Sequence, residues 1–365
     1  MNYGECFCWW RVILFSPVAL LFLISCAGTP LTKVGGDSGL PSELSQEFKD
    51  KFEVKDMPAT PAPAPVPAPS VTLASSTELK KGEKSKKQPK VQKKQPDPND
   101  VKIEAPKPES TIVPTQSSAN GFVYPNRRPK NDPIWIGEEL TYDVSYFGVA
   151  AGSFVLTVLP HKAINNRKVY HVKGTATSSK LFSMFYRLND TVETFFDYES
   201  LFSHRLHLVL DETKQTRDSL ELNDPEKAQT FYWNRWNHKT KGYIEVKQFA
   251  EIPRFAQDTL SALYYLRTVP LPNGAVATVP IVSESKHFEA VVTVLRRETV
   301  DSPLGDVQAI VVKPETKYQG VLKKQGDSFI WLSDDERRFV LRLEAKVRIG
   351  TVVAKLKKVS VGSPP

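Results

Sequence analysis

The chain has 365 residues, 40% of them hydrophobic, and an excess of 49 Lys and Arg over 41 Asp and Glu gives a formal charge of +8. Its three cysteines, Cys6, Cys8 and Cys26, lie at the N-terminal end, so the remainder can form neither a disulfide nor a cysteine metal site. Stability must therefore come from buried apolar surface, which requires a large folded part.

An apolar run from Val12 to Leu23 leads into Leu23-Ile24-Ser25-Cys26. The run is interrupted by Pro17 and is shorter than the roughly 20 residues that a membrane-spanning helix needs, which favours a cleaved export signal. The four residues resemble the bacterial lipobox. That resemblance implies a signal peptide over residues 1–25 and a mature lipoprotein with a palmitate-type membrane anchor on Cys26. Because Ala27 stands where an inner-membrane retention signal would place Asp, we expect the outer membrane, facing the periplasm.

Residues 26–120 are predicted to be a disordered tether. Residues 61–69 alternate Pro with Ala or Val, which favours an extended polyproline conformation. Eight lysines and only one acid, Glu83, follow between Lys80 and Lys94, and this run accounts for most of the net charge. It is interpreted as a solvated spacer or, alternatively, as a segment that adheres to anionic envelope polymers and headgroups. Nucleic acid would suit the same charge, but export argues against such a partner.

Residues 121–365 are predicted to form one mainly β domain. Leu140, Tyr142, Val144 and Tyr146 alternate with polar residues, as in a strand with one buried face. Further strands are predicted over 154–158, 169–177, 191–197, 205–210, 219–222, 230–233, 243–249, 275–282, 288–294, 307–312, 329–332, 340–347 and 351–359. Many short strands at regular spacing predict an antiparallel sandwich or barrel-like fold.

One or two short helices interrupt this pattern. Asp258 can cap a helix over residues 259–267, with Leu260, Leu263 and Tyr264 on one face and Arg267 near its negative end. A second helical turn is predicted over residues 179–185.

Three stretches of this domain resemble the family catalogued as domain of unknown function 3108. They are residues 137–152, with the pattern G-E-x-L-x-Y-x-V-x-Y-x-G-x-x-A-G, then residues 258–267, and a C-terminal hairpin from Trp331 through Arg338 to Leu356. The resemblance implies a curved antiparallel, barrel-like fold in envelope proteins that are often lipidated. It implies no reaction.

The sequence offers no recognisable catalytic, cofactor or metal motif. Gly36-Asp37-Ser38-Gly39 resembles a serine-protease fragment, but it lies in the predicted tether, where nothing positions a base. His204 and His207 are three apart in a predicted strand, so they should lie on opposite faces and not share a metal. The carboxylates of residues 334–336 are interpreted as a solvated turn. We therefore expect no enzyme and no cofactor.

Two aromatic groups are candidate ligand contacts. Residues 231–236 could present Trp233 and Trp236 as a stacking platform for sugar rings, although a hairpin with aromatics alternating between core and rim is favoured. Phe182, Phe185 and Phe195 belong to an aromatic-rich stretch that could line the entrance to an apolar cavity, although ordinary core is again favoured.

The sequence therefore predicts a non-enzymatic envelope lipoprotein whose β domain binds an apolar ligand or lipid, or a cell-wall polymer. A protein–protein scaffold in an envelope complex is the alternative, and a hydrolase acting on wall polymers is a weaker one. An apolar-ligand carrier would have an enclosed cavity, whereas a scaffold would have a filled interior and an exposed apolar patch.

Overall fold

The computed structural model describes residues 40–57, 114–117, 121–318, 321–323, 327–347 and 350–364. The predicted signal peptide, Cys26 and the lysine run from Lys80 to Lys94 lie outside these residues. Among the described residues, no helix has the length and hydropathy to cross a membrane.

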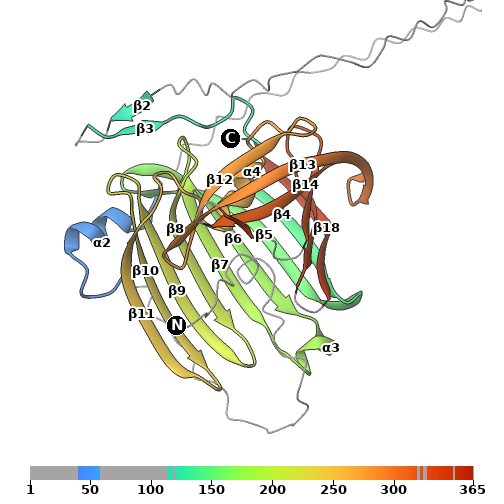
Figure 1. The fold of residues 1–365 in the computed structure, drawn as a ribbon, viewed down its shortest axis with the longest axis horizontal. Helices are drawn as coiled ribbons and strands as arrows, with labels where there is room; N and C mark the ends of the chain where they lie inside the picture. The colour runs from blue at the N-terminus through green and yellow to red at the C-terminus, as the bar shows by residue number, and fades with distance from the viewer. Residues whose placement is uncertain are drawn as a thin grey trace, which may run out of the picture. The chain divides into compact units, whose positions relative to one another are not determined.

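A single large antiparallel sheet dominates the folded part (Figure 1). Its strands run in the spatial order β11-β10-β9-β8-β7-β6-β5-β4-β18-β17-β16-β14-β13-β12, with β1 added to β5 and β15 to β14. The end strands β11 and β12 do not pair with each other in the described residues, so the sheet is not a closed barrel. The prediction of a mainly β, curved antiparallel domain is confirmed.

The strands are β1 (Lys55–Asp56), β4 (Ile136–Tyr146), β5 (Val149–Ile164), β6 (Arg167–Ser178), β7 (Asn189–Asp197), β8 (Ser203–Asp211), β9 (Gln215–Asp224), β10 (Gln229–His238), β11 (Gly242–Glu251), β12 (Val276–Ser283), β13 (Lys286–Ser302), β14 (Gly305–Tyr318), β15 (Val321–Lys323), β16 (Ser328–Ser333), β17 (Val340–Lys346) and β18 (Thr351–Ser363). A separate two-stranded sheet pairs β2 (Pro114–Ser117) with β3 (Val123–Pro125). The helices are α2 (Gln46–Phe52), α3 (Lys180–Ser183) and α4 (Ser261–Leu266).

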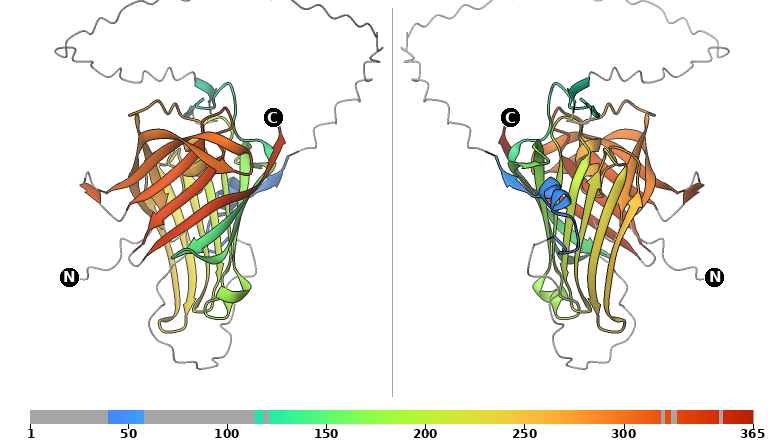
Figure 2. Two further views of the ribbon diagram at one scale, coloured as in Figure 1. Left: turned by 90° about the vertical axis from the view of Figure 1, so that its right-hand side faces the viewer. Right: turned by 90° about the vertical axis from the view of Figure 1, so that its left-hand side faces the viewer.

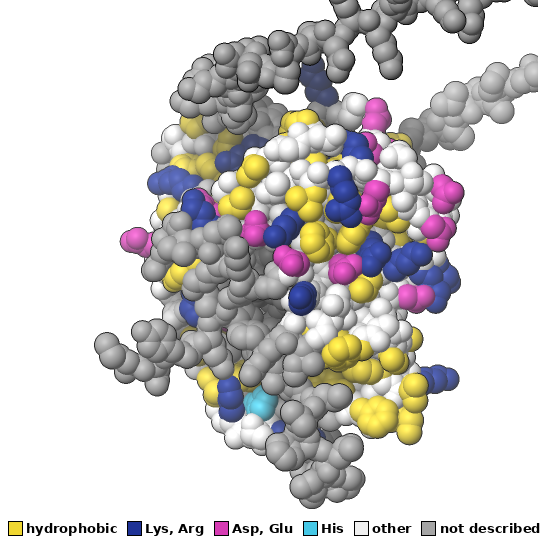
Figure 3. All heavy atoms as spheres, turned by 45° about the vertical axis from the view of Figure 1, so that its right-hand side comes forward, with side chains coloured by type: hydrophobic (Ala, Val, Ile, Leu, Met, Phe, Trp, Pro, Cys, Tyr) yellow, Lys and Arg dark blue, Asp and Glu magenta, His cyan; other side chains and the backbone are white. Residues whose placement is uncertain are grey.

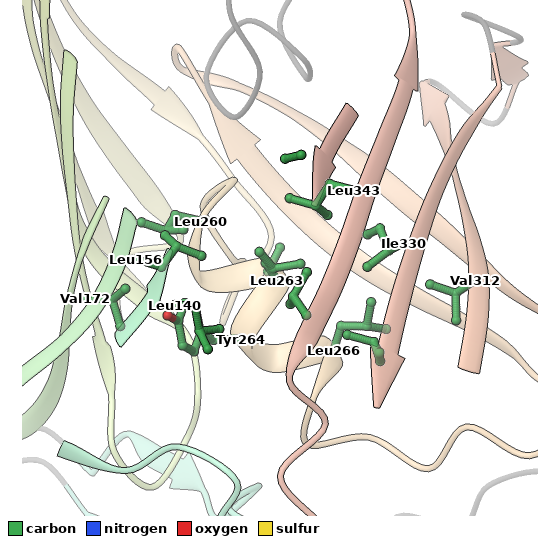
Figure 4. Packing of buried hydrophobic residues seen from close by; sticks show 14 of the residues in the cluster. Leu140, Leu156, Val172, Leu260, Leu263, Tyr264, Leu266, Val312, Ile330 and Leu343 are labelled. Atoms are coloured by element: carbon green, nitrogen blue, oxygen red, sulfur yellow. The ribbon is translucent and has the colours of Figure 1, made fainter. Parts of the chain in front are cut away.

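The sheet curls so that its two halves face each other, and α4 lies between them (Figures 2 and 4). On β4 the predicted alternation is confirmed, because Leu140, Tyr142 and Val144 are all buried. From α4, Leu260 and Tyr264 point toward β4–β6, while Leu263 and Leu266 point toward β16 and β17 (Figure 4). One continuous apolar cluster thus joins both halves of the sheet through the helix.

Polar contacts fix α4 in this position. The Asp258 carboxylate accepts hydrogen bonds from the backbone N–H groups of Leu260 and Ser261, both 2.7 Å long, so it binds free N–H groups at this end as predicted. The helix itself begins at Ser261 and ends at Leu266, so it is shorter than the predicted 259–267. Arg267 does not simply face the helix end. Its guanidinium is buried and binds both oxygens of the buried Glu138 at 2.6 and 2.7 Å, and Arg337 binds Glu138 at 2.7 Å. These three charges come from the three stretches that resemble the family.

The prediction of a disordered tether is wrong for residues 40–57. Leu40, Leu44, Phe48 and Phe52 are spaced four apart, and all pack in a second apolar cluster on the outer face of the sheet. Phe52 is buried, and Lys51 forms ion pairs with Asp224 (2.9 Å) and Glu226 (3.1 Å). Leu40 and Leu44 precede α2, whereas Phe48 and Phe52 lie within it, where spacing by four places them on one helical face that the sheet covers. Residues 58–113 are consequently flanked on both sides by residues of the folded unit.

Candidate functional site

The predicted aromatic contacts do not converge on one cavity. Phe195 is buried beneath α2 and stacks on His171 with ring centroids 4.3 Å apart. Trp233 packs against the same cluster, whereas Trp236 lies on the opposite face of β10. Phe182 and Phe185 lie in and just after α3, at the end of the sheet remote from this cluster. The structure therefore brings Phe195 and Trp233 together and separates both from the other three.

The two tryptophans are held by neighbouring polar groups. The Trp233 indole donates to Glu245 Oε1 at 2.8 Å, and the Arg235 guanidinium lies 4.1 Å from its ring centroid. Trp236 donates to Gln215 Oε1 at 2.8 Å. Cation–π partners of this kind occupy ring faces that a sugar would need for stacking. The geometry thus gives little support to a sugar platform on β10.

Five exposed apolar side chains lie instead at one end of the long strands. We call this group the apolar tip, and it comprises Phe147 (59% exposed), Val149 (57%), Leu181 (63%), Met184 (78%) and Phe185 (67%). Phe147 and Val149 belong to the β4–β5 turn, and the other three belong to α3 and the residue pair that follows it. Figure 2 shows α3 at the lower end of the green and yellow strands, and Figure 3 shows hydrophobic side chains gathered toward that end.

Local hydrogen bonds join the two parts of the apolar tip. Ser179 donates its backbone N–H to the carbonyl oxygen of Ala151 at 2.8 Å, and its hydroxyl donates to that of Ala150 at 3.2 Å. The same hydroxyl accepts from Phe182 N at 3.2 Å and so caps α3. This fixes α3 against the start of β5. The exposed apolar side chains therefore belong to a structured surface and not to a loose loop.

The turn that carries Phe147 is similarly constrained. Phe147 itself has φ of 51°, and Gly148 follows with φ of 76°, so the chain reverses tightly between β4 and β5. The Phe147 ring lies so close to Gly350 that an added Cβ there would stand 2.5 Å from it. Gly350 thus permits the β17–β18 turn to support the aromatic ring at the apolar tip.

A pair of carboxyl groups lies directly behind the apolar tip. Tyr186, next to Phe185, donates its hydroxyl to Glu212, which also accepts from Gln215 Nε2 at 2.6 Å. Asp190 is hydrogen-bonded to Glu212 and accepts from the backbone N–H of Asp211 at 3.0 Å. Burial, followed by the charge of Glu212, raises the pKa of Asp190 to about 8. The pair therefore retains a proton at neutral pH and anchors the segment that follows α3.

The other polar groups singled out in the sequence have structural partners. His204 lies 3.2 Å from Asp197 and His207 lies 3.0 Å from Asp218, so the two histidines contact different carboxylates. The Asp335 carboxylate accepts hydrogen bonds from the backbone N–H groups of Arg337 (2.9 Å) and Arg338 (2.8 Å), and these bonds stabilise the turn that contains all three residues. In the part of the chain that the structure describes, no group of three His, Cys, Asp or Glu side chains could hold a metal ion.

Comparison with known proteins confirms the family resemblance. The family model described as "Protein of unknown function (DUF3108)" matches residues 141–357. No curated protein matches the chain. A crystal structure of a beta-barrel-like protein of the DUF1849 domain of unknown function from Brucella abortus is similar at 10% identity. The match covers 63% of this chain and 99% of that one, with a TM-score of 0.43.

A second solved structure, a protein from Bacteroides fragilis with a YmcC-like fold, is also 10% identical to this chain. That match covers 62% of this chain and 96% of the other, with a TM-score of 0.28. At these TM-scores, neither likeness bears on the function of this chain.

Proposed function

Because the chain belongs to the DUF3108 family of proteins of unknown function, no known activity comes with the family, and we propose a function from the site itself. The protein is a lipid-anchored envelope protein without catalytic activity, attached through Cys26 and facing the periplasm from the outer membrane. Its β domain binds lipid, and the apolar tip is the contact surface.

One observation carries this proposal: the apolar tip exposes five large apolar side chains together at one place. Single exposed apolar residues are ordinary, but a contiguous group marks a surface that becomes buried against something else. Fully burying one such side chain stabilises an association by about 1.5–3 kcal/mol. The five side chains together can thus hold the domain on an apolar phase.

The packing inside the curled sheet favours lipid binding at the surface over an acyl chain enclosed in the interior. Leu263 and Leu266 of α4, and Leu260 just before it, are buried in the cluster that joins the two halves of the sheet, so side chains fill the space beside the helix. An acyl chain enclosed there would have to displace this packing. The apolar tip offers apolar area without any such rearrangement.

A protein-binding scaffold remains the second candidate, and a specific feature favours it. Strand β11 is an edge of the sheet, and its Tyr243 (56%) and Phe249 (48%) are exposed. An edge strand leaves backbone N–H and C=O groups without a partner strand, and these can pair with a strand of another protein. The two candidates use different surfaces and can be tested separately.

The test is flotation of the purified chain with phosphatidylcholine vesicles. Residues 27–365 suit the assay because they contain every residue that the structure describes and lack the apolar segment before Cys26. The variant Met184→Ser/Phe185→Ser removes the most exposed part of the apolar tip. We expect it to bind vesicles at least tenfold more weakly, since it forfeits roughly 2 kcal/mol or more of apolar burial.

The matched control is Val276→Ser/Val361→Ser, which removes two exposed apolar side chains (60% and 49%) outside the apolar tip. It should bind like the unmodified chain. Equal vesicle binding by the tip variant and by the unmodified chain would refute the proposal, and so would equal loss in the control.

A further inference from the structure

We propose that the apolar tip and the cationic turns beside it form one docking surface for an anionic lipid bilayer. This inference rests on the proposed function and adds the class of lipid and the orientation of the domain. The domain would stand end-on, with the turns that follow β4, β6, β8 and β10 facing the headgroups.

The charges of these turns are the first support. In residues 147–148, 179–188, 212–214 and 239–241 the cations are Lys180, Arg187, Lys214, Lys239 and Lys241, and the one carboxylate is Glu212. Arg187 is paired with Asp211 at 2.7 Å, so the four lysines supply the positive charge. Glu212 is buried and hydrogen-bonded to Tyr186 and Gln215, so it does not present its charge outward. The cationic side chains therefore dominate the outward face of this end.

The opposite end of the same strands carries charges of both signs. Its turns, residues 165–166, 198–202 and 225–228, contain Glu199, Glu226 and Lys227. Arg127 and Arg128 also lie at this opposite end, because their backbone N–H groups donate to the Glu199 carbonyl oxygen at 2.8 and 3.0 Å. What sets the other end apart is the combination of exposed lysines with the apolar tip. An anionic surface would attract the lysines beside the apolar tip, and the apolar side chains next to them would then favour this end at the bilayer.

Hydrogen bonds hold the cationic turns next to α3. Three hydrogen bonds join Arg187 and Thr213: Arg187 N donates to Thr213 Oγ1 at 2.7 Å, and Thr213 N and Oγ1 donate to Arg187 O at 2.9 and 3.4 Å. Lys239 N then donates to Lys214 O at 3.0 Å. The three turns therefore form a connected row that begins at the apolar tip. Apolar side chains flanked by lysines are the composition that lies at a bilayer interface.

The anchored chain has enough length for this orientation. Leu40 packs against the apolar cluster that includes Val169 of β6. From Val169, β6 runs nine residues to Ser178 beside the apolar tip, so this cluster lies about 30 Å from the tip. If Cys26 is the anchor, residues 27–39 can span at most about 45 Å. The bilayer that holds the anchor is therefore within reach of the apolar tip, and it is the occupant that we assign to this surface.

The test compares vesicles of phosphatidylcholine alone with vesicles that also contain phosphatidylglycerol. Lys180, Lys214 and Lys239 are exposed, so Lys180→Gln/Lys214→Gln/Lys239→Gln should leave the fold intact. We expect residues 27–365 to bind the anionic vesicles more tightly than the neutral ones at low salt. The triple variant should lose about 100-fold in affinity for anionic vesicles, since each lysine near such a surface contributes roughly tenfold or less.

The control variant Lys130→Gln/Lys227→Gln/Lys286→Gln makes the same charge change at exposed positions elsewhere, and it should retain most of the preference. The triple variant should bind neutral vesicles as the unmodified chain does, which separates this inference from the proposed function. Equal binding of the unmodified chain to both vesicle types, or full anionic binding by the triple variant, would overturn the inference while leaving the proposed function standing. Binding to neither vesicle would overturn both and assign the apolar tip to a protein partner.

Discussion

The substitution Glu138→Gln tests what holds α4 between the halves of the sheet. Glu138 is fully buried and accepts two charge-assisted hydrogen bonds from Arg267 (2.6 and 2.7 Å) and one from Arg337 (2.7 Å). The Arg267 side chain is 1% exposed and that of Arg337 is 13% exposed. The glutamine side chain would fill the same volume but would leave the buried Arg267 guanidinium and the partly buried Arg337 guanidinium without their shared counter-charge.

Removing one partner from a buried ion pair costs about 3–5 kcal/mol. For a domain of this size, such a loss lowers the melting temperature by roughly 10 °C. Circular dichroism during thermal and urea unfolding measures both quantities. Glu139→Gln is the matched control, because Glu139 is the exposed neighbour and should change stability by less than about 0.5 kcal/mol. An equally small effect of Glu138→Gln would refute the claim that this ion cluster holds α4.

Three further predictions concern other parts of the fold. Phe52→Ala removes about 3–5 kcal/mol of packing under α2, so limited proteolysis should cleave residues 40–57 faster, and unchanged protection would contradict their docking. Gly152→Ala should destabilise strongly in urea unfolding, because a Cβ there would stand 2.1 Å from the Thr177 carbonyl oxygen. The pKa of Asp190 is about 8 in the folded protein, whereas the usual value is 3.8, so the free energy of unfolding should fall as pH rises between these values. Asp190→Asn should reduce this dependence of stability on pH. An unchanged pH dependence would contradict the pairing with Glu212.

Period-two alternation predicted the sheet well, because half-buried antiparallel strands must alternate apolar and polar residues. The helix after Asp258 was also predictable from its capping residue. The helix α2 was missed, although Phe48 and Phe52 carry a helical spacing within it. The surrounding polar and Pro-rich composition hid this signal, since a single short amphipathic helix becomes stable only when a sheet covers its apolar face.

The candidate site was predictable only in part. Phe185 was singled out as a candidate ligand contact and is exposed, but its sequence neighbourhood resembles that of Phe195, which is buried. Strand register, and the turn against which α3 packs, decide whether an aromatic residue lies in the core or at the apolar tip. The local sequence pattern predicts neither the register nor that packing. The contact between Glu138 and Arg267 joins residues 129 positions apart and could not be read from the sequence.

The most direct test of the central claim is a depth measurement on bound protein. Residues 27–365 contain no cysteine, so Met184→Cys provides a single labelling site at the apolar tip for a nitroxide spin label, and Val276→Cys provides the control. On vesicles containing phosphatidylglycerol, the label at residue 184 should become accessible to oxygen and protected from a water-soluble paramagnetic reagent, while the label at residue 276 stays in water. A bound protein whose label at residue 184 remains as exposed to water as it is in solution would contradict the account.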